Sequence, residues 1–161
     1  MTTISTSNLI GVALTNTDST AAFTTGTTVN LDDGGQAIYV QAASDTSQYA
    51  AVAILANNTC VPLTTTNAAT SKRFAVAQTS IASGYYGWVQ SGGVVRINLA
   101  ISCNPSVPLF TTATGGVLDD ATVSGGGVGL VAGLVATATA TVATSVTCVG
   151  GYPHVIGYSG V

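Results

Sequence analysis

Charged side chains are scarce in this sequence. Only 6% of the 161 residues are charged, against about 25% in an average soluble domain. There is no glutamate, and three basic residues, Lys72, Arg73 and Arg96, leave a formal net charge of −3. The six acids are Asp18, Asp32, Asp33, Asp45, Asp119 and Asp120.

This shortage of cations excludes two classes of partner. A protein that binds nucleic acid neutralises phosphates with clustered lysines and arginines, and three basic residues cannot form such a groove. The net negative charge would also repel anionic membranes. We therefore expect no nucleic-acid partner and no membrane partner. Because surface charge usually keeps free monomers soluble, the chain must rely on neutral polar groups or bury surface in an assembly.

Signals for export and membrane insertion are missing as well. The first ten residues contain no basic region and no long apolar stretch, so we do not expect a signal peptide. The most apolar segment, Val128–Ala136, is about half as long as a membrane-spanning helix. We expect the chain to be made in the cytoplasm. In that compartment Cys60, Cys103 and Cys148 are expected to be buried, reduced thiols.

Strong helix formers are rare, whereas threonine, valine, alanine, serine and glycine dominate the sequence. β-branched residues favour pleated, half-buried strands, and the 19 glycines favour turns. With 47% hydrophobic residues and little net charge, the chain does not have the composition of a disordered protein. An all-β protein is predicted.

Alternating residues predict about ten short strands. Gln36–Ala42 is one strand, with Ile38, Val40 and Ala42 on one face. The clearest alternation, in Val94–Ser102, places polar Arg96, Asn98 and Ser102 on one face. Its opposite face consists of Val95, Ile97, Leu99 and Ile101. The continuous apolar run Val128–Val135 predicts a strand that is buried on both faces.

Strands at this spacing predict a single β-barrel or β-sandwich, and a jelly-roll topology is among the sandwich alternatives. We assign residues 31–161 to this domain. Residues 1–30 are rich in threonine, serine and asparagine. They are interpreted either as a frayed terminus with a first strand near Leu9–Leu14 or as an extended N-terminal arm that lies on a neighbouring subunit.

No set of residues predicts chemistry. His154 is the only histidine, and a lone histidine is more often structural than the base of a serine-hydrolase triad. The Asp32–Asp33 pair lies beside Gly34, and the Asp119–Asp120 pair follows the Gly115–Gly116 pair. In such turns aspartate commonly bonds the backbone. The three cysteines and His154 lack the close ligand spacing of a zinc site. We expect no catalytic residue, no metal and no cofactor, and hence no enzyme.

Three aromatic residues lie close together in the sequence, at Tyr85, Tyr86 and Trp88. An exposed aromatic patch stacks sugars or anchors an interface. We expect Trp88 in the core and at least one of the tyrosines at an interface.

Several segments resemble the capsid decoration, or cement, proteins of tailed phages. They are Asp33-Gly34, Tyr39–Ala42, Ala75–Gln78, Gly84–Gln90 with its Tyr-Gly-Trp-Val-Gln block, and Gly115–Asp119. The resemblance covers roughly residues 30–135. It implies a β-rich virion protein, often a homotrimer, that sits on the outer surface of the assembled head and bridges subunits of the major capsid protein. It brings no catalytic residues and no cofactor.

From these observations we expect the arm and the aromatic residues to contact the shell or sister subunits. The candidate interface residues are Ile4, Leu9, Phe23, Tyr85 and Tyr86. Two alternatives remain open at this point. One is another virion component, such as a tail or fibre domain, and the other is a carbohydrate-binding β-module.

Overall fold

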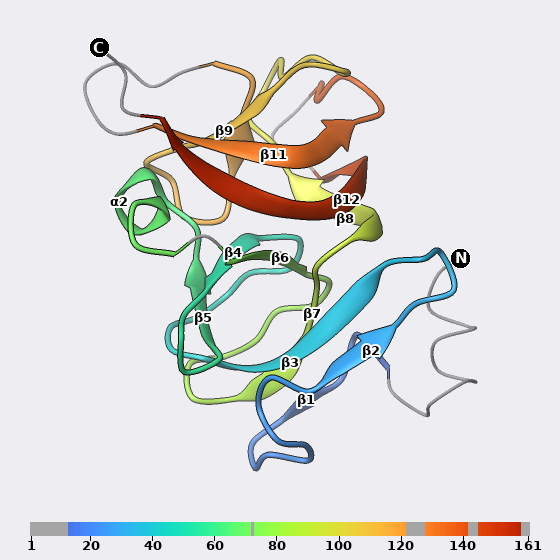
Figure 1. Cartoon of the computed structure of the whole chain (residues 1–161), viewed down its shortest axis with the longest axis vertical. Coiled ribbons are helices and arrows are strands. Elements are labelled where there is room, and N and C mark those ends of the chain that lie inside the picture. Colours follow the sequence, from blue (N-terminus) through green and yellow to red (C-terminus); the bar gives the residue numbers. More distant parts are fainter. Residues whose placement is uncertain (1–12, 72, 122–127, 142–144, 159–161) are drawn as a thin grey trace.

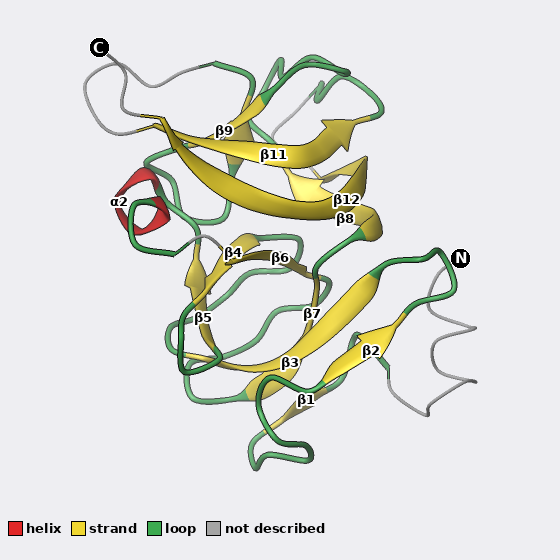
Figure 2. Cartoon of the chain, viewed as in Figure 1, coloured by secondary structure: helices red, strands yellow, loops and turns green. Residues whose placement is uncertain are grey.

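The computed structural model describes residues 13–71, 73–121, 128–141 and 145–158, which are almost entirely β-structure. This result confirms the all-β prediction. Figure 2 shows strands joined by loops and a short helix. The elements are β1 (Thr17–Asp18), β2 (Thr28–Asn30), β3 (Gln36–Ala42), β4 (Ala51–Ile54), β5 (Thr59–Pro62), α2 (Thr65–Ala68), β6 (Arg73–Ala77), β7 (Tyr86–Gln90), β8 (Gly93–Asn98), β9 (Leu109–Thr111), β10 (Leu118–Asp119), β11 (Val128–Ala136) and β12 (Ser145–Tyr158).

Five strands close into a barrel. They follow the order β7-β3-β5-β4-β6, and a further pairing of β6 with β7 completes the ring. The β3–β5 pair is parallel and the other four pairs are antiparallel. The barrel interior is filled by Ile38, Val40, Ala42, Val52, Ile54, Cys60, Ala75, Ala77, Ile81 and Val89. Of the predicted alternatives, the barrel is therefore the one that forms.

A second sheet lies over one side of the barrel, as the upper layer in Figure 1. Its strand order is β8-β12-β11-β9-β10. The long strand β12 pairs with β8 through its first half and with β11 along most of its length, and it reaches β6 through His154 opposite Arg73. This connection makes the two layers one continuous sheet.

The barrel strands β4 and β6 separate two apolar cores. Val52 and Ala75 face the barrel interior, whereas Ala53, Phe74 and Val76 face the second sheet. The second core is completed by Val95, Ile97, Leu99, Cys103, Leu109, Leu118, Val131, Leu134, Ala136, Ala140, Val146, Cys148 and Val155. Because both faces of β4 and β6 are covered, these strands are apolar without alternation except for the exposed Arg73 at the start of β6, as strands buried on both faces are expected to be.

The segment from residue 13 to residue 31 covers another side of the barrel. β1 pairs with β7 and β2 pairs with β3. This segment closes a third apolar cluster of Leu14, Leu31, Ala37, Tyr39 and Trp88. Residues 13–30 of the predicted arm thus pack on the chain's own barrel, while residues 1–12 lie outside the described residues.

Two strand predictions were wrong in their details. The strand predicted for Val94–Ser102 ends at Asn98. The chain then turns, with Ser102 at φ 68°, so Ile101 is 62% exposed instead of facing the core.

The run Val128–Val135 is not buried on both faces. The register shifts between Ala132 and Leu134, and Gly133 has φ 79°, which is typical of a β-bulge. Val131 and Leu134 point into the core on either side of this shift, whereas Val135 is 45% exposed.

The helix α2 begins at a capping box, in which the Thr64 hydroxyl and the Asn67 side chain each accept a backbone N–H bond from the other residue. It has 4 residues. Among the described residues no helix is long and apolar enough to cross a membrane.

The position of β4 and β6 between the two apolar cores generates a first prediction. Replacing Phe74, which is 3% exposed, by alanine leaves a cavity against the second sheet and should cost about 3–5 kcal/mol of unfolding free energy. Phe23→Ala, at a ring that is 43% exposed, serves as the matched control and should cost less. Urea denaturation followed by Trp88 fluorescence measures both variants. A loss at Phe74 no greater than that at Phe23 would show that the two layers are not tightly packed.

Candidate functional site

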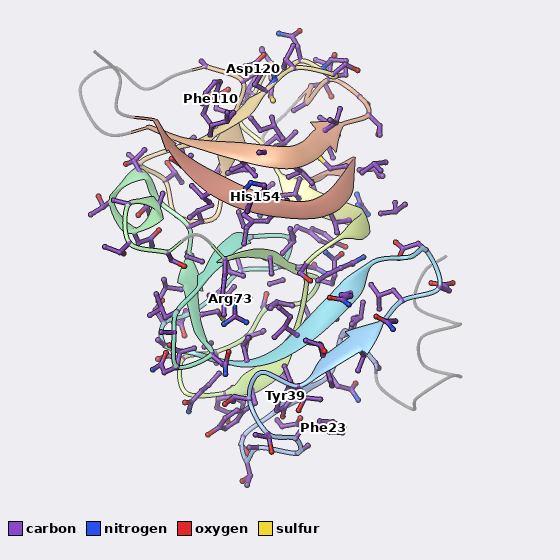
Figure 3. All side chains as sticks on the ribbon, in the orientation of Figure 1. Phe23, Tyr39, Arg73, Phe110, Asp120 and His154 are labelled. Atoms are coloured by element: carbon purple, nitrogen blue, oxygen red, sulfur yellow. The ribbon has the colours of Figure 1, made fainter. Side chains whose placement is uncertain are left out.

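An aromatic cluster lies where residues 13–31 meet the barrel. The Tyr39 and Trp88 rings are 5.1 Å apart on neighbouring strands, and Phe23 contacts both edge-on, at 5.3 and 5.4 Å between centroids. Tyr86 stacks on Tyr39 at 6.1 Å. Figure 3 shows Phe23 beside Tyr39 at one end of the molecule. Trp88 is 3% exposed, so the prediction that it is a core residue is confirmed.

The Tyr39 hydroxyl fastens this cluster to the covering segment. It donates to Asp18 at 2.7 Å and accepts from the Ala22 N–H at 3.1 Å. Burial, followed by the nearby Asp18 carboxylate, raises the pKa of the Tyr39 phenol. The hydrogen bonds account for why residues 18–22 stay on the barrel although they carry few apolar side chains.

The predicted interface residues have different environments. Phe23 and Tyr85 are each 43% exposed, and Tyr86 is half-buried. The structure brings Phe23 and Tyr86 together around Tyr39, whereas no described ring contacts Tyr85. Ile4 and Leu9 lie outside the described residues.

A row of exposed valines crosses the outer face of the second sheet. Val94 on β8 pairs with Val149 on β12, which pairs with Val135 on β11. Their exposed fractions are 44%, 53% and 45%. The solvated face of an antiparallel sheet is normally polar, so this valine row is an exception. Beside it opens a hollow of about 200 Å³ whose walls include glycines of β8, β12 and the Asp33–Gly35 turn.

The sequence alone indicated one member of this row, Val94. Val94 lies on the same face of the predicted strand as Arg96 and Asn98, and thus on its polar side. The alignment with Val135 and Val149 could not be predicted, because it depends on the register of three strands that are far apart in the chain.

A group of possible metal ligands lies at the other end of the molecule, where Figure 3 labels Asp120. Ligand atoms of Cys103, Asp119 and Asp120 lie within 4.8 Å of one another. Backbone and side-chain hydrogen bonds from Asn104, at 2.9 and 2.8 Å, lower the pKa of Asp120. Burial, and then the bond with Asp120, raises the pKa of Asp119.

This arrangement does not favour metal binding. Burial, followed by the two carboxylates, raises the pKa of the Cys103 thiol to about 11, whereas a metal requires the thiolate. Asp120 is committed to Asn104, and Asp119 accepts the Asp120 N–H at 2.8 Å. Both carboxylates thus accept backbone N–H groups, from Asn104 and Asp120, which is the backbone role predicted for this pair.

No protein-family model matches the chain, and no curated protein sequence matches it.

The three cysteines generate a second prediction. All three are buried and free, and burial is the main cause that raises their pKa values, to about 11 for Cys60 and Cys103 and about 12 for Cys148. Native protein at pH 8 should therefore leave all three thiols unmodified by a maleimide, and denatured protein should label all three.

The same shifts predict a loss of stability in alkali. The folded state holds thiol protons that the unfolded state releases above its pKa of about 8.5. The unfolding free energy should thus be constant below this pH and fall as the pH rises toward 11. Urea midpoints across this range measure the effect. Rapid labelling of the native protein, or a midpoint independent of pH, would contradict the burial of these thiols.

Proposed function

We propose that this chain is a structural virion protein that decorates and stabilises the assembled head of a tailed phage. It binds the outer surface of the head and bridges subunits of the major capsid protein. The role is one of binding and not of catalysis, and it requires no cofactor. The protein is made in the host cytoplasm and ends in the virion.

The valine row is the observation that carries this proposal. Val94, Val135 and Val149 point away from the core on three adjacent strands, and Arg96 is the only charged residue of β8. A protein partner that covers this face buries apolar area without having to desolvate many charges. The glycine-walled hollow beside the row offers space for a side chain of that partner.

The segments that resemble decoration proteins also support the proposal. Tyr39–Ala42 lies in β3, Ala75–Gln78 begins in β6, and Gly84–Gln90 ends in β7. These are three of the five barrel strands. The resemblance is therefore concentrated in the part of the fold on which the other layers are built.

Self-association as a homotrimer is part of the proposal. A symmetric shell presents many equivalent sites, so a trimer binds through several weak contacts at once, and its avidity exceeds the affinity of each contact. Tyr85, whose ring is 43% exposed, and Phe23 remain the proposed contacts of the aromatic end with the shell or with sister subunits.

Of the alternatives, a carbohydrate-binding module is less well supported. Sugar stacking needs open ring faces, and the 3% exposure of Trp88 leaves Tyr85 as the most open of the three rings in that segment. A tail or fibre component would use the valine row in the same way, and binding to isolated heads distinguishes it from a decoration protein.

The valine row generates a third prediction. Val149→Asp introduces a charge at the centre of the row and should abolish co-sedimentation with undecorated mature heads, because the buried carboxylate would be unpaired. Ile101→Asp, at a side chain that is 62% exposed outside the row, is the matched control and should leave binding unchanged. Circular dichroism checks that both variants fold. Full binding by Val149→Asp, or no binding of the unaltered protein to heads, would overturn the proposal.

A further inference from the structure

A cleft of about 350 Å³ lies at the junction between the barrel and the second sheet. This volume is within the usual range of ligand pockets, roughly 300–1,000 Å³. The cleft is independent of the valine row except for Val94, which lines both. Its walls are formed by Leu14, Thr15, Gln48, Tyr49, Gln78, Gln90, Val94, Val95, Arg96 and Thr147.

Side chains, and not a neighbouring strand, cover the barrel-side edge of β8. The Val94 carbonyl accepts from Gln90 Nε2 at 3.2 Å, and the Arg96 carbonyl accepts from Gln78 Nε2 at 3.4 Å. Gln48 does not reach β8 with its side-chain nitrogen; its Nε2 donates to the Gln78 carbonyl at 3.1 Å. Three glutamines thus line the cleft with their amide nitrogens committed to the backbone.

Two of these side-chain oxygens can be reached from the cleft. Gln48 is exposed and Gln78 is half-buried, and no described residue donates a hydrogen bond to Oε1 of either. Gln90 is only 2% exposed, and among the described residues no buried side-chain oxygen or nitrogen lacks a hydrogen-bond partner. The cleft therefore offers two amide acceptors, from Gln48 and Gln78, to a ligand that carries N–H or O–H groups.

Among the described residues of the lining, Arg96 carries the only charge. Its guanidinium lies 5.0 Å from the centre of the Tyr49 ring, and among the described residues no carboxylate forms an ion pair with it. A guanidinium that stacks on an aromatic ring still exposes its N–H groups, which match a carboxylate.

The backbone at Tyr49 is strained to hold this arrangement. Tyr49 has φ 62°, which is unfavourable for a bulky residue. It is fixed there by its own N–H, which donates to the Ala77 carbonyl at 2.7 Å, and by its carbonyl, which accepts from the Asn98 N–H at 2.8 Å. Strain of this kind is concentrated at functional sites.

We propose that the cleft binds an aspartate or glutamate side chain carried by an extended peptide segment of a partner protein. The carboxylate accepts hydrogen bonds from the Arg96 guanidinium, and N–H groups of the segment donate to Oε1 of Gln48 and Gln78. Leu14, Val94 and Val95 form an apolar wall for a neighbouring aliphatic side chain. This site does not depend on the proposed function, since an acidic peptide can bind whether or not the protein binds heads.

A peptide fits better than an acidic sugar. Proteins commonly stack a sugar ring on an open aromatic face. Among the described residues of the lining the one aromatic ring is Tyr49, and the Arg96 guanidinium already lies over it. The Oε1 atoms of Gln48 and Gln78 act as acceptors like the carbonyl groups of a strand edge, so they suit the N–H groups of an extended segment.

The test uses the full chain and two peptides, acetyl-Thr-Asp-Val-amide and its neutral counterpart acetyl-Thr-Asn-Val-amide. Side-chain ¹H–¹⁵N signals of Arg96 and the three glutamines are followed during each titration. The aspartate peptide should shift these signals saturably and less strongly at higher salt, and the asparagine peptide should bind about fivefold more weakly or worse. Glucuronate is the third probe, and tighter binding of glucuronate than of the peptide would overturn the choice of a peptide.

Variants separate the site from non-specific attraction. Arg96→Gln removes the charge and should abolish the difference between the two peptides. Arg73→Gln is the control, because Arg73 is also exposed but donates to Asn58 outside the cleft, at 2.9 Å. Tyr49→Asn tolerates the positive φ and removes the ring, so it should fold and bind the aspartate peptide more weakly. No saturable shift in the unaltered protein, or equal binding by Arg96→Gln, would refute the proposal.

Discussion

The double burial of β4 and β6 is the constraint on which the rest of the structure depends. These two strands belong to the barrel and also pack against the second sheet, so each residue of Ala51–Ile54 and of 74–77 faces one apolar core or the other. Alanine at positions 51, 53, 75 and 77 keeps both faces apolar while it allows the layers to approach closely. A charge anywhere from residue 51 to 54 or from 74 to 77 would be buried in a core, and the sequence has none there.

This architecture accounts for the unusual surface. One face of the second sheet packs against β4 and β6, and its other face carries the valine row. The edge of β8 that meets the barrel is protected by Gln78 and Gln90, where many proteins use charged residues to guard a strand edge. Neutral amides thus replace charges at this edge. Covering such an apolar and weakly charged surface with another protein gains free energy. The low charge content therefore agrees with the proposed role in a virion.

The strands were largely predictable because local alternation determines them. Gln36–Ala42 was predicted with the bounds that β3 has, and its Ile38 face lies inside the barrel as expected. The errors lie where a long-range contact overrides the local pattern. Ile101 continues the alternation of β8, but the chain turns there so that Cys103 enters the core.

The sites were much less predictable than the fold. The valine row requires the register of β8, β11 and β12, and the cleft requires the ends of three barrel connections to meet β8. Gln48, Gln78 and Gln90 are ordinary polar residues in the sequence, and only the structure shows that all three line one cleft. The aromatic residues were noticed because they are close in sequence, and yet two of them, Tyr86 and Trp88, serve mainly to hold residues 13–31 on the barrel.

An electron cryomicroscopy map of mature heads mixed with this protein tests the central claim most directly. The account predicts density for the protein on the outside of the shell, with the β8–β12–β11 face turned toward the major capsid protein and Val149 at the contact. A map in which the protein is bound with this face open to solvent would contradict the account, and so would a map of fully undecorated heads.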